Sequence, residues 1–254
     1  MEAEGVATIC VGTDLASSKR AIEIAEMSPN IWAVVGQHPT DTNEAFDEAE
    51  YAKLAKHPKV VAIGECGFDF FRIPKDAMQQ NTGQESGKTV FEIQKEMFLK
   101  HIALAQTSGK PLMIHARPSK AGLGNNGMDA YEETLKILSS FPEVRANFHF
   151  FVGDKVIAQK SLEAGHTMSF DGPITFTDEY DEVIKMLPLS SIMAETDSPF
   201  ATPEPYRSAD RKQRAEPWMV KDIVKKIAEI RAEDEETVRK AMLENAKQFF
   251  KILL

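Results

Sequence analysis

Four side chains able to bind metal ions lie at or near the ends of four different apolar runs. They are a glutamate, two histidines and an aspartate: Glu65, His115, His149 and Asp197. Carboxylate and imidazole groups together form the ligand sets of zinc, manganese and iron, and oxygen-rich sites also bind magnesium. A cation held by such groups activates water and polarises a phosphoryl or carbonyl oxygen. These residue types therefore predict metal-assisted chemistry, provided that the fold brings the four side chains together.

Each of these residues taken alone also has an ordinary structural interpretation. A histidine at a strand end is more often a hydrogen-bonded structural residue. Glu195, which precedes Asp197 and follows the last predicted strand, has the ordinary interpretation of a charge at the start of the following loop. We expect His57 and His101 to be solvated on helical surfaces, and His166 to lie in a turn. The four candidates become informative as a set because all of them fall on the same predicted rim.

Short apolar runs alternate with amphipathic stretches along the whole chain. The runs predict seven strands: Val6–Val11, Ile31–Val35, Val60–Ile63, Leu112–Ile114, Ala146–Phe150, Thr167–Phe170 and Ile192–Ala194. The stretches predict helices at Ser17–Met27, Glu44–Lys56, Phe91–Thr107, Asp129–Ser139, Lys155–Ala164, Glu179–Leu187, Pro217–Arg231 and Glu235–Leu253. This alternation predicts parallel strands joined by right-handed crossovers, as an open doubly wound sheet or a closed barrel. In both architectures ligands bind where the C-terminal ends of the strands emerge.

The stretch Val60–Phe70 begins with apolar and small residues that read as a buried strand, and a carboxylate, Glu65, follows where that strand is predicted to end. Burial of a carboxylate is costly unless the group is paired or bound to a metal ion. Gly64 and Gly67 flank Glu65 and Cys66, and a tight backbone turn at these glycines would bring Glu65 to a pocket. We expect Cys66 to pack behind Glu65, with a role as a soft metal ligand left open.

Composition limits the class of protein. The chain has 254 residues and a formal net charge of -9, so bulk charge does not indicate nucleic-acid binding, although a locally positive site remains possible. Its two cysteines lie in apolar contexts, which favours a reducing compartment and a cytoplasmic location. No apolar stretch approaches 18 residues, so no membrane contact is expected.

Five motifs follow one another along the chain: "GQHP" at Gly36–Pro39, "IGECGFDF" at Ile63–Phe70, "PLMIHAR" at Pro111–Arg117, "FHFFVGD" at Phe148–Asp154 and "ETDSPFATPEPYR" at Glu195–Arg207. Together they make the chain resemble the TatD family of metal-dependent deoxyribonucleases, within the amidohydrolase-like TIM barrels. The resemblance covers essentially the whole chain. It implies an α/β fold of the (β/α)8 TIM-barrel type, as a single domain over residues 1–254, with a metal site of one or two ions at its C-terminal face.

The same resemblance implies roles for individual residues. Glu65 would bridge two metal ions, and His115 and His149 would complete the second site. Asp197 would bind the first ion and act as general base, which makes Asp197 and Glu65 the catalytic pair. Arg117 would hold substrate phosphate, for which a guanidinium fork is better suited than an ammonium group. The cofactor would be a divalent metal, with Mg, Mn and Zn as candidates.

The sequence departs from the family pattern at its start. Members normally open with a strand carrying Asp-x-His-x-His, whose histidines bind the first metal, and nothing like it precedes Gly5. We therefore expect a barrel with seven visible strands that apparently lacks its first. A truncated sequence is the favoured explanation; a natural variant with a site of Glu65, His115 and His149, or a gap closed by a neighbouring chain, are the alternatives.

The resulting hypothesis is phosphodiester hydrolysis of DNA, single-stranded and exonucleolytic, by a monomer or weak dimer. His38 is expected to contact phosphate or an outer water, Tyr206 to stack on a base, and Arg207 to grip the backbone. Arg207 opens a basic run with Arg211, Lys212 and Arg214, which reads equally well as solvated surface. Two rivals remain: an amidohydrolase-type hydrolase of C–N or ester bonds, and a non-catalytic barrel scaffold that has lost part of its metal site.

Overall fold

Strands and helices alternate along the chain in the order that the apolar runs predict. The computed structural model describes residues 4–42, 44–71, 88–119, 129–208 and 213–253. Its strands are β1 (Thr8–Val11), β2 (Ile31–Val35), β3 (Val60–Asp69), β4 (Leu112–Arg117), β5 (Ala146–Phe148), β6 (Thr167–Phe170) and β7 (Ile192–Ala194). Its α-helices are α1 (Leu15–Glu26), α2 (Glu48–Leu54), α3 (Val90–Ser108), α4 (Ala130–Leu138), α5 (Lys155–Glu163), α6 (Asp181–Met186), α7 (Val220–Arg231) and α8 (Glu235–Phe250). The α/β fold class with seven strands is thus confirmed for the described residues.

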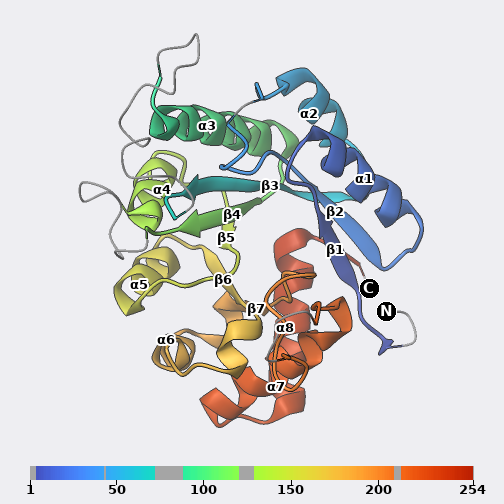
Figure 1. Cartoon of the computed structure of the whole chain (residues 1–254), viewed down its shortest axis with the longest axis vertical. Helices are drawn as coiled ribbons and strands as arrows, with labels where there is room; N and C mark the ends of the chain where they lie inside the picture. The colour runs from blue at the N-terminus through green and yellow to red at the C-terminus, as the bar shows by residue number, and fades with distance from the viewer. Residues whose placement is uncertain (1–3, 43, 72–87, 120–128, 209–212, 254) are drawn as a thin grey trace. The chain divides into compact units, whose positions relative to one another are not determined.

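The chain divides into two compact units (Figure 1). The first unit is Ile9–Asn147, and the second is Met1–Thr8 together with Phe148–Leu254. Strands β1 to β5 follow one another in chain order across the sheet of the first unit, and β6 lies beside β7 in the second. The pairs β2–β3, β3–β4 and β6–β7 are parallel. The expectation of a single domain over residues 1–254 stays a prediction.

Helices of the first unit begin and end at residues that cap them. Helix α3 starts after Thr89, whose side chain accepts from the backbone of Glu92 while the Glu92 carboxylate accepts from the backbone of Thr89. It ends at Gly109, which has a left-handed φ of 66°. Helix α1 packs on β2 and α3 packs on β3 (Figure 1). The core between them contains the fully buried Phe68 and Ile102.

The second unit is built around β6, β7 and the last two helices. Helices α7 and α8 pack on each other, and α8 packs on β7. Asn245 of α8 donates to the carbonyl oxygens of Leu189 and Ile192, which ties the helix to the start of β7. Arg231 similarly donates to the carbonyl oxygens of Ile184 and Leu187 at the end of α6. These bonds satisfy backbone groups where elements end.

Strand β3 is irregular at its two glycines. The register with β4 shifts between Ile63 and Cys66, and Gly64 and Gly67 have φ values of 150° and 129°. A Cβ atom at Gly67 would overlap the carbonyl oxygen of His115 on β4. Only glycine combines such a backbone with so close an approach. The tight turn expected at these glycines is not formed, because the strand continues to Asp69 instead of ending at Ile63; the glycines lie instead at a shift of register around Glu65.

Replacing Gly67 by alanine is expected to lower the free energy of unfolding by more than about 2 kcal/mol, because the methyl group meets backbone and the φ is strained. Chemical denaturation followed by circular dichroism measures this change. Gly109→Ala is the matched control, since it has a positive φ but open space around the new Cβ. Equal losses in the two variants would show that the contact with His115 does not matter.

Candidate active site

The first unit gathers four polar side chains from three neighbouring segments. Glu65 and Asp69 come from β3, His115 comes from β4, and His38 follows β2. The parallel register sets Gly67 opposite His115. Because side chains alternate along a strand, Glu65 and Asp69 share a face with Gly67. The imidazole of His115 therefore lies between the two carboxylates.

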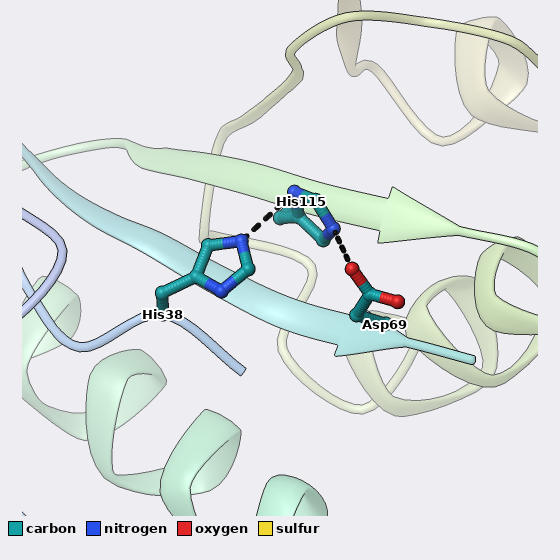
Figure 2. A group of neighbouring side chains, drawn as sticks. All are labelled: His38, Asp69 and His115. Carbon is teal, nitrogen blue, oxygen red and sulfur yellow. Dashed lines mark hydrogen bonds and ion pairs between the residues drawn. The ribbon is translucent and has the colours of Figure 1, made fainter. Parts of the chain in front are cut away.

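Distances confirm this arrangement within the first unit. His115 Nδ1 lies 2.7 Å from Glu65 Oε1, and His115 Nε2 lies 3.0 Å from Asp69 Oδ2. Figure 2 shows His115 with Asp69 on one side and His38 on the other. Asp69 is fully buried and Glu65 is 9 % exposed. The two carboxylates are thus held out of bulk water. Charge interactions are stronger in such a buried environment than in water.

His38 approaches the same place from the segment after β2. Its Nε2 lies 3.2 Å from His115 Nδ1 and 3.6 Å from Glu65 Oε1. Its Nδ1 accepts a hydrogen bond from the backbone N–H of Thr40, and the Thr40 hydroxyl lies 2.7 Å from the same nitrogen. The backbone N–H of His38 donates to Thr13 O. The turn thus fixes the ring so that Nε2 faces the cluster.

Two buried polar side chains of α3 support this cluster and were not foreseen as functional. Gln94 accepts from the Asp69 backbone N–H and donates to Pro39 O, so it joins the end of β3 to the turn after His38. His101 accepts from the Gln37 backbone N–H and donates to Met97 O. The expectation that His101 is solvated is wrong, because the ring is fully buried against Phe46. Burial lowers the pKa of His101 to about 4.

Cys66 lies beside Glu65 in the sequence, but its side chain faces another way. The thiol donates to Met113 O at 3.6 Å and is fully buried. Burial raises the pKa of this thiol well above its ordinary value, and the negative charge of Glu65 raises it further. A protonated thiol is a poor metal ligand, so the packing role expected for Cys66 agrees with the structure.

The second unit contains its own group of acids around an imidazole. His149 lies directly after β5, and its Nδ1 is 2.9 Å from Glu195 Oε1. The same glutamate oxygen accepts a hydrogen bond from the Phe150 backbone N–H at 2.7 Å. Glu195 follows β7 and is therefore more than a charge for the next loop. Asp197 lies two residues further on, at a positive φ of 45°, in a turn closed by the Phe200 N–H and Asp197 O. Positive φ in a non-glycine residue often marks a functional site.

Asp171 is a further acid that sequence analysis missed. It follows β6 directly, so reading the first polar residue after every strand would have found it. Its carboxyl is 3 % exposed, and among the described residues its Oδ2 has no hydrogen-bond partner. Burial raises its pKa well above the ordinary value, and the charges of Glu195 and Asp197 raise it further.

The residues expected to bind substrate lie against aromatic rings. The Arg117 guanidinium sits 4.1 Å from the centroid of the half-exposed Phe71 ring in the first unit. In the second unit Arg207 sits 4.0 Å from the Phe176 centroid, and Tyr206 packs edge-on to Trp218 at 5.0 Å. Such stacking orients the plane of a guanidinium and leaves the N–H donors along the edge of that plane able to bind a ligand. In the basic run, Arg211 and Lys212 lie outside the described residues.

The donor atoms of both units fit a divalent cation. In the first unit Glu65 Oε1 and His115 Nδ1 lie 2.7 Å apart. Ligand atoms at about 2.0–2.2 Å from a common cation have comparable spacings. In the second unit Oδ2 of Asp171 is a buried carboxyl oxygen without a hydrogen-bond partner among the described residues, and a cation would satisfy it. Convergence of the four predicted ligands on a single centre stays a prediction.

An α/β fold of parallel strands whose ends carry carboxylate–imidazole clusters is the arrangement expected of a metal-dependent hydrolase. The family described as "TatD related DNase" matches residues 1–251, and the chain belongs to that family. The resemblance read from the five sequence motifs is therefore confirmed.

Relatives and solved structures agree with this assignment. The chain is 34 % identical over 252 residues to "Uncharacterized metal-dependent hydrolase YabD" of Bacillus subtilis, covering 96 % of this chain and 87 % of the relative. It is 28 % identical over 251 residues to "3'-5' ssDNA/RNA exonuclease TatD" of Escherichia fergusonii, covering 96 % and 87 %. The crystal structure of YjjV, a TatD homolog from Escherichia coli K12, superposes with a TM-score of 0.80 at 22 % identity, covering 98 % and 88 %, which shows the shared fold. No helix among the described residues is long and apolar enough to cross a membrane.

Proposed function

We propose that this metal-dependent hydrolase is a deoxyribonuclease that cleaves phosphodiester bonds of single-stranded DNA from an end. The observation that carries the proposal is the Glu65 Oε1–His115 Nδ1 pair at 2.7 Å, held between strands β3 and β4. Relatives named as 3'-5' ssDNA/RNA exonucleases support the choice of substrate. The free thiols of Cys10 and Cys66 agree with the proposed cytoplasmic location.

The proposed metal ligands are Glu65 and His115 in the first unit and His149 and Asp197 in the second. One or two divalent cations, Mg, Mn or Zn, would supply Lewis-acid polarisation of the phosphoryl group and of water. Glu65 is the carboxylate best placed to serve two cations, because it is buried beside two imidazoles. Glu195 and Asp69 keep the two ligand histidines in place.

Asp197 is the proposed general base, and it takes a proton from the attacking water. Its backbone lies in a closed turn at positive φ, which fixes the position from which the carboxylate projects. The buried Asp171 lies close enough to Glu195, Asp197 and His149 for the charges of those groups to shift its pKa. A base fixed in this way needs no reorganisation when the proton moves.

The remaining predicted residues bind the substrate backbone and its bases. Arg117, stacked on Phe71, offers its planar fork of N–H donors to a phosphate. Arg207, stacked on Phe176, does the same from the second unit. His38 contacts a phosphate oxygen or an outer water, and Tyr206 offers a ring face on which a base stacks.

The test uses the purified protein and a 5'-labelled single-stranded oligonucleotide with Mg²⁺ or Mn²⁺. We expect a ladder of products that shorten from one end, no reaction in EDTA, and slower reaction on a duplex of the same sequence. Turnover of ester or amide substrates without DNA cleavage would favour the amidohydrolase rival. Failure to bind Mg²⁺, Mn²⁺ or Zn²⁺ at all would favour the scaffold.

A further inference from the structure

The His115 ring lies between two carboxylates, and a neutral imidazole can donate to one of them only. Its Nε2 is 3.0 Å from Asp69 Oδ2, and its Nδ1 is 2.7 Å from Glu65 Oε1 (Figure 2 shows the Asp69 side). A neutral imidazole carries a proton on one nitrogen and a lone pair on the other. The position of that proton decides which atom of His115 can bind a cation.

The environment of Asp69 favours a hydrogen bond from His115 to Asp69 over one from His115 to Glu65. Its side chain is fully buried, whereas Glu65 keeps 9 % exposure. Its Oδ1 already accepts from the Phe71 backbone N–H at 2.9 Å, which orients the carboxylate so that Oδ2 points at His115. A fully buried carboxylate requires donors, because without them its desolvation is not compensated.

A second contact places the lone pair on the other nitrogen. The Thr40 backbone N–H donates to His38 Nδ1, so neutral His38 carries its proton on Nε2. That Nε2 lies 3.2 Å from His115 Nδ1, which must then be the acceptor. Two independent hydrogen bonds therefore give His115 the same tautomer, with the proton on Nε2.

We propose that Asp69 is a positioning residue that fixes the tautomer and orientation of His115. It holds the proton on Nε2 and turns the lone pair of Nδ1 toward Glu65 Oε1. Two electron-pair donors 2.7 Å apart repel each other unless a cation accompanies them. Asp69 thus makes Nδ1 and Oε1 a preformed pair of ligand atoms without itself binding the ion. The second part of this inference rests on the proposed function, since it takes His115 as a metal ligand.

The competing assignment makes Asp69 a ligand. His38, Asp69 and His115 have ligand atoms within 4.8 Å of one another, a spacing that could hold an ion. Against this, Asp69 Oδ1 already accepts from the Phe71 N–H, and Oδ2 lies 3.0 Å from His115 Nε2, within hydrogen-bond distance. A ligand role would require those bonds to break at a fully buried position.

The test compares wild type with Asp69→Asn. The amide accepts from Phe71 N–H through its oxygen and turns its NH2 toward His115, which forces the imidazole proton onto Nδ1. Long-range 1H–15N spectra of metal-free, 15N-histidine-labelled protein, at a pH where His115 is neutral, report the tautomer. The signal is assigned by its loss in His115→Gln. We expect Nε2–H in wild type and Nδ1–H in Asp69→Asn, with Zn²⁺ affinity by calorimetry reduced about 10–100-fold.

Gln94→Met is the matched structural control. It removes bonds to the Asp69 backbone and Pro39 O but leaves the His115 ring in place. We expect lower stability with unchanged tautomer and Zn²⁺ affinity. The proposal is overturned if Asp69→Asn keeps the wild-type tautomer, or if wild type itself carries the proton on Nδ1, a result that needs no folded variant. Absence of Zn²⁺ binding in wild type would instead refute the metal role, and the tautomer result would stand on its own.

Discussion

The substitution Glu65→Gln is expected to lower the rate of metal-dependent hydrolysis at least about 10³-fold, with the protein still folded. The amide keeps the size of the Glu65 side chain but removes the negative charge that faces His115 Nδ1 at 2.7 Å. Loss of a ligand that positions a cation removes several kcal/mol of transition-state stabilisation, which corresponds to a factor of about this size. Initial rates on the single-stranded oligonucleotide at saturating Mn²⁺ measure the effect.

Glu23→Gln is the matched control for this variant. Glu23 lies on α1 in the same unit, is largely exposed and pairs with Arg20 at 2.7 Å. Its replacement removes the same charge without touching the site, so the rate should stay at the wild-type value. Circular dichroism confirms folding of both variants. Near wild-type activity in Glu65→Gln would remove Glu65 from the metal site.

Acid is expected to destabilise the protein through His101. Burial lowers the pKa of this histidine to about 4, whereas in the unfolded chain it is near 6.5. Between these pH values the unfolded state binds more protons, so the free energy of unfolding falls as the pH falls from about 6.5 to about 4. The full loss is about 3 kcal/mol. His166, whose pKa burial also lowers to about 4, adds a change of the same sign.

Urea denaturation in EDTA at several pH values across this window measures the loss. His101→Gln removes the titrating group while its amide oxygen can still accept from the Gln37 N–H. We expect the variant to be of similar stability near pH 8 and to lose about 3 kcal/mol less than wild type by about pH 4. Parallel stability profiles for the two proteins would show that His101 does not control the acid response.

The fold was largely predictable because continuous apolar runs and amphipathic stretches carry local information. Strands β2, β6 and β7 begin and end where the runs predicted. Strand β3 runs six residues beyond its expected end, since Glu65 and Asp69 are polar residues within a buried strand. A prediction from hydropathy ends a strand at the first charged residue. In the folded protein the strand continues, because the tertiary structure supplies partners for that charge.

The candidate site was only partly predictable. Glu65 and His115 were found because polar residues at strand ends converge in parallel α/β folds, and the structure brings these two together. Gln94 and His101 were not, because they lie on a helix where the sequence gives no reason to bury a polar side chain. Their partners are backbone groups of the segments around His38 and Asp69, which are distant in the sequence.

The order of strands and helices, the types of the candidate ligands and family membership were determined by the sequence alone, since each depends on local patterns and motifs. The tertiary structure decided which atoms of those candidate ligands face each other. His115 has two nitrogens that no sequence pattern distinguishes; the register of β3 against β4 sets one against Asp69 and the other against Glu65. Hydrogen-bond partners across strands exist only after folding, and they fix the proton on a ring whose two tautomers are otherwise close in energy.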